Sequence, residues 1–122
     1  MDIEQLIETW QINKRIKLYL LDAIAPEHLI DALSSKGRNA GEQFAHIHNV
    51  RLMWLKASMP EALDGQLNVE KENAAEKDLL KRSLEQSGVA IVKLLEFAGA
   101  NGGRVKGFKP HVTAFVAYLT AH

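Results

Sequence analysis

The chain has 122 residues, of which 47% are hydrophobic and 25% charged, and its 15 basic and 15 acidic residues cancel to a formal charge of zero. This composition is typical of one soluble globular domain, and it offers no basic surplus for binding nucleic acid or an anionic membrane. There is no cysteine, which excludes disulfides, thiolate nucleophiles and thiolate metal ligands. No apolar run approaches the ~20 residues that span a bilayer, and the acidic start lacks the features of a secretory signal. We therefore expect a cytoplasmic protein.

The first half of the chain predicts two amphipathic helices. The first runs from Asp2, a candidate N-cap, to Ile24, and Pro26 prevents its continuation. Residues 26–38 indicate a helical turn followed by a loop. A second helix is predicted from about Asn39 to about Ala57, with Asn39 as its N-cap.

The second half predicts two more helices and no strand. Residues 59–73 read as a long connection, and a third helix runs from about Ala74 to Ala98. Gly88 lies within this helix at a cost of about 1 kcal/mol relative to Ala, which indicates close packing there. Pro110 suits the first turn of a fourth helix. Four amphipathic helices in a single domain, residues 1–122, predict an all-α antiparallel four-helix bundle.

Two histidines of the second helix cannot bind the same ion. His46 and His48 are two residues apart, which is about 200° of rotation on a helix. The stripe that contains His46 also includes Val50, Met53 and Ala57. His48 lies opposite, in a smaller apolar stripe with Phe44, Leu52 and Leu55. A helix with two apolar sides is either central or part of an oligomer contact, so we predict a homodimer.

The final residue, His122, lies on the same side of the fourth helix as Phe115 and Tyr118. A histidine on an apolar face is more often a hydrogen-bonded core residue than a metal ligand. However, inward-facing histidines on separate helices are how bundle interiors build metal sites. Two ligands are fewer than the three that a catalytic zinc site normally takes from the protein. The third ligand would lie four residues beyond His122, but the sequence ends at His122.

Three segments resemble the DinB-like family of four-helix-bundle metalloproteins: NKRIKLYLLDAI, GEQFAHIHNVRLMWL and KPHVTAFVAYLTAH. In that family the second helix carries one ligand histidine in a context similar to FAHI, and the fourth carries an H-x-x-x-H pair. The resemblance therefore implies that His46 and His122 are metal ligands, with His122 the first member of the pair. It also implies that the fourth helix is incomplete and that the third ligand is missing.

The resemblance further implies a function. A site of three imidazoles suits a divalent transition metal, with zinc or nickel as the first choices. Family members with assigned activities include transferases and isomerases that use low-molecular-weight thiols. We therefore expect a metal-dependent thiol S-transferase, or a related hydrolase or isomerase, that acts on a small-molecule substrate. The alternative is a non-catalytic helical or dimerisation domain without a functional metal site.

No catalytic residue can be named from the sequence, but Asn13 is a candidate for a role in the pocket. It interrupts the apolar stripe of the first helix between Trp10 and Leu20, and a buried polar side chain needs a hydrogen-bond partner. The resemblance supports a pocket role, because the family often has Asn at this place. A buried amide bonded to backbone or water explains the pattern equally well.

Overall fold

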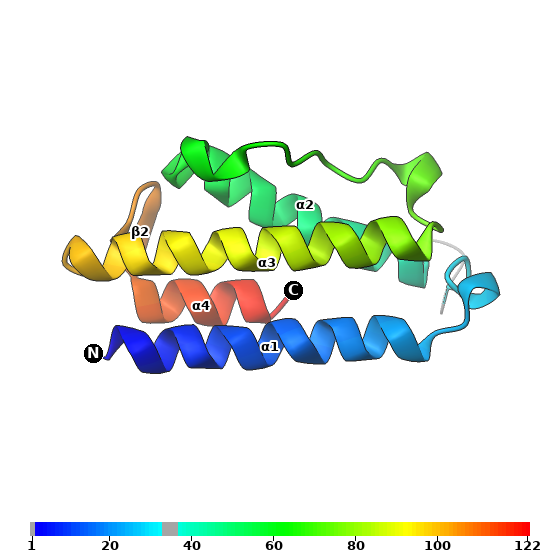
Figure 1. Ribbon diagram of the computed structural model, residues 1–122, viewed down its shortest axis with the longest axis horizontal. Helices are drawn as coiled ribbons and strands as arrows, with labels where there is room; N and C mark the ends of the chain where they lie inside the picture. Colours follow the sequence, from blue (N-terminus) through cyan, green and yellow to red (C-terminus); the bar gives the residue numbers. More distant parts are fainter. Residues whose placement is uncertain (1, 33–36) are drawn as a thin grey trace.

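The computed structural model describes residues 2–32 and 37–122, which are mostly helical (Figure 1). The α-helices of this described part are α1 (Ile3–Ala23), α2 (Ala40–Ser58), α3 (Lys77–Ala100) and α4 (Val112–Thr120). Two short strands, β1 (Arg104–Val105) and β2 (Phe108–His111), precede α4. Short 3₁₀ turns cover Pro26–His28, Pro60–Leu63 and Lys71–Asn73. Part of the loop predicted over residues 26–38, namely residues 33–36, lies outside the described residues.

The predicted caps of the first two helices are confirmed. The Asp2 carboxylate accepts hydrogen bonds from the backbone N–H groups of Glu4 and Gln5, at 3.0 and 3.4 Å. At the start of α2, the Asn39 side chain accepts from the Glu42 N–H at 2.7 Å, and the Glu42 carboxylate accepts from the Asn39 N–H at 3.0 Å. This reciprocal capping box satisfies two backbone donors and fixes the residue at which α2 begins.

The predicted start of the fourth helix is wrong, because a β-hairpin occupies that position. Val105 pairs with Phe108 and Arg104 with His111 in an antiparallel register. Gly107 adopts a positive φ of 86° in the turn, a conformation that glycine reaches without steric cost. Pro110 therefore lies in β2, and α4 begins only at Val112. A strand as short as β1 produces no alternating pattern that the sequence could reveal.

The third helix also starts later than predicted, at Lys77, and a 3₁₀ turn precedes it. In Figure 1, α3 runs between α1 and α2, and it packs against both. The short α4 lies beside α1 and α3. The arrangement leaves one apolar core that is divided into two clusters of buried side chains.

The two clusters occupy different parts of the helices. The first is built mainly from the C-terminal halves of α2 and α3 with Trp10 and α4, and it includes Leu55, Ile91, Leu95 and Phe115. The second lies towards the opposite end and includes Leu21, Phe44, Leu80 and Leu84, with no contribution from α4. The buried apolar side chains of α4 thus pack in the first cluster.

Buried polar side chains lie between the two clusters along the helices: Lys14, His48, Arg51, Ser83 and Ser87. Arg51 is 2% exposed, and its Nη1 donates to the Leu84 carbonyl at 3.0 Å and to the Ser87 hydroxyl at 3.2 Å. Its guanidinium carbon lies 4.8 Å from the centroid of the Trp10 ring, a cation–π contact. Burial lowers the pKa of Arg51 to about 10, so the side chain stays charged at neutral pH.

The close packing predicted at Gly88 is confirmed. A Cβ atom at this position would collide with the aliphatic part of Lys14 and would lie 3.5 Å from Nη1 of Arg51. The Gly88 carbonyl accepts a hydrogen bond of 2.9 Å from the Trp10 indole N–H. The absence of a side chain therefore lets α1 and α3 approach each other beside Arg51.

The interpretation of the two stripes on α2 needs a correction. Phe44, His48, Leu52 and Leu55 are buried within the chain. Met53, placed in the stripe of His46, is 53% exposed. Helical periodicity shows that a helix has two apolar sides but not which side faces the core. The stripe that motivated the homodimer is therefore core rather than surface.

Gly41 offers a test of how tightly the start of α2 is packed. Its N–H donates to the Leu29 carbonyl at 2.7 Å, and a Cβ atom there would collide with the backbone carbonyl of Ala74. We expect Gly41→Ala to lower the free energy of unfolding by about 1–3 kcal/mol, because backbone cannot move aside as a side chain can. Urea denaturation followed by circular dichroism measures this change.

The matched control is Gly99→Ala in α3, where the atoms nearest to the new Cβ belong to the side chain of Ile3. Its cost should be smaller, because a side chain can shift where the Ala74 backbone cannot; the gain in helix propensity over Gly, about 1 kcal/mol, applies to both substitutions. Equal destabilisation by the two substitutions would contradict the close approach of Gly41 to Ala74.

Candidate metal centre

The structure brings together the two histidines that the sequence singled out. The rings of His46, on α2, and His122, just after α4, lie with their centroids 5.8 Å apart and their planes inclined by 43°. His48, in contrast, is 1% exposed in the core, where its Nε2 lies 2.8 Å from the Leu67 carbonyl. The two histidines of α2 thus point to different surroundings, as their spacing predicts.

The ring of His122 is oriented by its own helix. Its Nδ1 lies 3.0 Å from the Tyr118 carbonyl, and because a carbonyl can only accept, Nδ1 carries the proton. The lone pair is therefore on Nε2, which is the arrangement found in metal-bound histidines whose other nitrogen donates to a carbonyl. The Tyr118 ring adds an edge-to-face contact, with centroids 4.8 Å apart.

An aromatic cluster fixes the helix that carries Tyr118. Trp54 of α2 makes edge-to-face contacts with Phe108, Phe115 and Tyr118, with centroid separations of 5.6, 5.5 and 5.9 Å. Such contacts stabilise a pair of rings beyond the area they bury. The cluster joins α2, β2 and α4, so the helix preceding His122 is held against the helix of His46.

His46 is a neutral imidazole at neutral pH. Burial lowers its pKa, and the positive charge of Arg38 and the proximity of His122 lower it further. No hydrogen bond joins its ring to another residue of the described ranges. A neutral ring with a free nitrogen is the form that binds a transition metal.

The pair fits a metal ion as a partial site. Two imidazoles that share a zinc ion, with Zn–N distances of about 2.0–2.1 Å, have ring centroids roughly 5 Å apart, close to the 5.8 Å observed here. In residues 2–32 and 37–122, no group of three or more His, Asp or Glu side chains is placed to hold a metal. His46 and His122 would therefore supply two ligands, and water or a small molecule would have to supply the others.

The charges near the pair favour an anion. Lys17 donates from Nζ to the His122 carbonyl at 3.3 Å, and its pKa is lowered by burial and by the charge of Arg51. Among the described residues, none of Lys17, Arg38 and Arg51 forms an ion pair with a carboxylate. Cations without counterions attract anionic ligands and disfavour an additional bare cation. An anionic ligand of the metal would relieve this conflict.

Asn13 lies one helical turn before Lys17 on α1. Its Oδ1 is buried and has no hydrogen-bond partner in the part of the chain that the structure describes. The interpretation of Asn13 as a purely structural amide requires such a partner in the protein or a water. An unpaired acceptor at this position can accept a hydrogen bond from a water or from a ligand.

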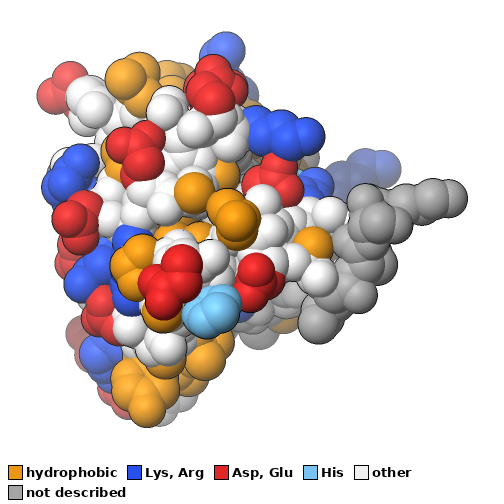
Figure 2. Space-filling model, turned by 90° about the vertical axis from the view of Figure 1, so that its right-hand side faces the viewer, with side chains coloured by type: hydrophobic (Ala, Val, Ile, Leu, Met, Phe, Trp, Pro, Cys, Tyr) orange, Lys and Arg blue, Asp and Glu red, His pale blue; other side chains and the backbone are white. Residues whose placement is uncertain are grey.

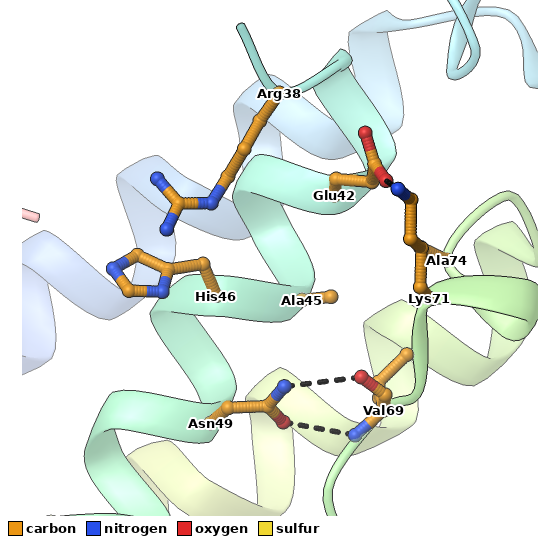
Figure 3. Close-up of a pocket in the computed structure, with 8 residues that line it drawn as sticks. All are labelled: Arg38, Glu42, Ala45, His46, Asn49, Val69, Lys71 and Ala74. Atoms are coloured by element: carbon orange, nitrogen blue, oxygen red, sulfur yellow. Dashed lines mark hydrogen bonds and ion pairs between the residues drawn. The ribbon is translucent and has the colours of Figure 1, made fainter.

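Two basic residues near the pair were not identified from the sequence. Lys17 could have been suspected, because it shares a helical face with Asn13. Arg38 precedes the N-cap of α2, and no sequence pattern around it indicates a binding role. Only the folded chain brings its side chain beside the ring of His46 (Figure 3).

Three further observations concern the surface of the molecule and the classes of partner that could bind it. His28 and Asp31, three residues apart, form an exposed contact of 2.8 Å on the surface and do not belong to the site. Figure 2 shows acidic, basic and apolar side chains interspersed over the end of the molecule where α1 ends and α2 begins, so this face gives no support for a nucleic-acid partner. In the described residues, no helix is long and apolar enough to cross a membrane.

No protein family, curated protein or solved structure matches the chain in the comparisons with known proteins. The resemblance to the DinB-like family thus stays a prediction from the sequence, and the geometry of the site has to be interpreted by its chemistry.

The buried ring of His48 should make stability depend on pH. Burial is the main cause of the lowered pKa of His48. Hydrogen bonding to the Leu67 carbonyl raises this pKa, the positive charge of Arg51 lowers it, and hydrogen bonding to the Ser83 carbonyl raises it. As the pH falls through about 6.5, the unfolded chain takes up a proton at His48 before the folded chain does. The free energy of unfolding should therefore fall as the pH decreases from 7 towards 5.

Urea denaturation at several pH values measures this slope. His48→Asn keeps a donor for the Leu67 carbonyl but removes the titrating group, and it should flatten the slope even if the protein is less stable throughout. The exposed His28→Asn is the control and should leave the slope unchanged. An unaltered slope in His48→Asn would show that His48 is not the group responsible.

Proposed function

We propose that this chain is a four-helix-bundle metalloprotein that binds one divalent transition-metal ion through His46 and His122, with zinc or nickel as the first candidates. The observation that carries the proposal is the approach of these two rings to 5.8 Å from separate parts of the chain. The orientation of His122 by the Tyr118 carbonyl supports it, because it leaves Nε2 free as a ligand.

The activity proposed for the site is a thiol S-transfer, or a related hydrolysis or isomerisation. A bound ion of this kind supplies Lewis acidity that lowers the pKa of a thiol or water at neutral pH. The residues of this chain would contribute positive charge around that anion, from Lys17 and Arg38. Because neither cation has a carboxylate partner among the described residues, both remain able to orient an anionic thiol or substrate.

A second candidate is a non-catalytic helical domain whose histidines only pack. It is favoured by the presence of two ligand side chains rather than three and by the contact of His122 with Tyr118, which needs no ion. The homodimer that the second apolar stripe of α2 suggested stays a prediction, although the residues of that stripe are buried within the chain. A monomer by light scattering would contradict it.

Metal analysis tests the proposal. We expect the purified chain to bind one zinc or nickel ion loosely at pH 7.5, because its described residues supply two protein ligands rather than the usual three, and titration calorimetry measures the affinity. His46→Ala and His122→Ala should each weaken binding by more than about tenfold, since even partners of metal ligands contribute 10–100-fold. Affinity should fall as the pH decreases through about 6.5, because protons compete for the imidazole nitrogens.

His28→Ala is the matched control, because the ring of His28 is exposed and pairs with Asp31 rather than with His46 or His122. It should bind metal as the unaltered chain does. Equal losses in His28→Ala and His46→Ala, or no binding of either metal when the unaltered chain is titrated in the calorimeter, would favour the non-catalytic alternative.

A further inference from the structure

A cavity of about 320 Å³ lies on the outer face of α2, between this helix and residues 69–74 (Figure 3). Its volume is at the lower end of the range for small-molecule sites, roughly 300–1,000 Å³. Ala45 and Ala74 contribute small apolar side chains to its lining. A ligand that fits this space has a short carbon skeleton.

One end of the cavity is formed by the candidate metal ligand itself. His46 lines the cavity, and Figure 3 shows the Arg38 guanidinium directly beside its ring. The same ring faces His122 at 5.8 Å. A molecule in the cavity would therefore contact Arg38 and the candidate ligand His46.

The far wall is held in place by a double hydrogen bond. The Asn49 amide donates to the Val69 carbonyl at 3.0 Å, and its oxygen accepts from the Val69 N–H at 2.9 Å (Figure 3). Both polar groups of Asn49 are thus bonded to the protein. They fix the segment opposite α2 and leave recognition of the ligand to the charged residues.

The charges of the cavity sum to a positive value. Glu42 is its only acidic lining residue among the described residues, and its carboxylate is engaged by the Asn39 N–H at 3.0 Å and by Lys71 at 3.7 Å. Arg38 has no carboxylate partner in the described part of the chain. The planar guanidinium is suited to bind a carboxylate through two parallel hydrogen bonds.

We propose that this cavity binds the carboxylate of a small organic acid through Arg38 and presents the rest of that molecule to His46. The inference deepens the proposed function and rests on it for the role of His46: the thiol or substrate of the site would carry a carboxylate within a few carbons of its reacting group. The binding of the carboxylate itself needs no metal.

The first experiment uses the metal-free chain. Butyrate and butyramide have the same skeleton, and their binding is followed by changes in backbone amide resonances on NMR titration. We expect butyrate to shift residues 38–49 and 69–74 and to bind about tenfold more tightly than butyramide, which is the effect of one hydrogen bond to a charged group. Arg38→Gln should remove this preference, and Arg38→Lys should retain part of it.

Arg104→Gln is the matched control, since Arg104 is exposed and donates only to the Lys109 carbonyl. It should bind butyrate as the unaltered chain does. Equal binding of butyrate and butyramide, shifts outside the cavity, or an unchanged preference in Arg38→Gln would each overturn the inference.

The second experiment separates this inference from the proposed function. In the zinc-loaded chain, 3-mercaptopropionate should bind more tightly than the neutral 2-mercaptoethanol, and Arg38→Gln should abolish the difference. A chain that takes up no zinc but still prefers butyrate would refute the proposed function and keep the carboxylate site. A chain that binds zinc and both thiols equally would refute the carboxylate site alone.

Discussion

The burial of the Arg51 guanidinium is the constraint around which the helices are arranged. An arginine at 2% exposure is stable only if its charge is compensated, and here the compensation comes from a carbonyl, a hydroxyl and an aromatic face rather than from a carboxylate. Each of these groups is on α1 or α3. Meeting this requirement brings α1, α2 and α3 together at one level and divides the apolar core into two clusters.

The candidate metal centre is also built on α2, but on another side of that helix. His46 projects from the side of α2 that does not hold Arg51, and it meets His122 because the aromatic contacts of Trp54 hold α4 against α2. The cavity beside His46 is closed on its other side by the pairing of Asn49 with Val69. The proposed ligand pair and the proposed ligand pocket thus share His46 of α2, and two unrelated sets of contacts support them.

The sequence predicted the elements with strong local signals. Asp2, Asn39 and Pro26 mark helix ends through their own backbone chemistry, so α1 and α2 were placed to within a residue. The β-hairpin was missed because its strands are too short to show a period, and the core side of α2 was misjudged because Met53 resembles a core residue. The pairing of His46 with His122 was anticipated from helix faces and from the family resemblance. Arg38 and Lys17 were not, since only the three-dimensional arrangement brings their charges to the histidines.

The anchoring of α4 by its core side chains has a consequence for how this site would evolve. The position of His122 depends on the apolar side chains that hold α4 in the core, above all Phe115, which is fully buried. Residues that never touch a ligand therefore set the distance between the two imidazoles. Divergence among descendants of this chain could change the geometry of the proposed metal site through the size of a core side chain, with both histidines left in place.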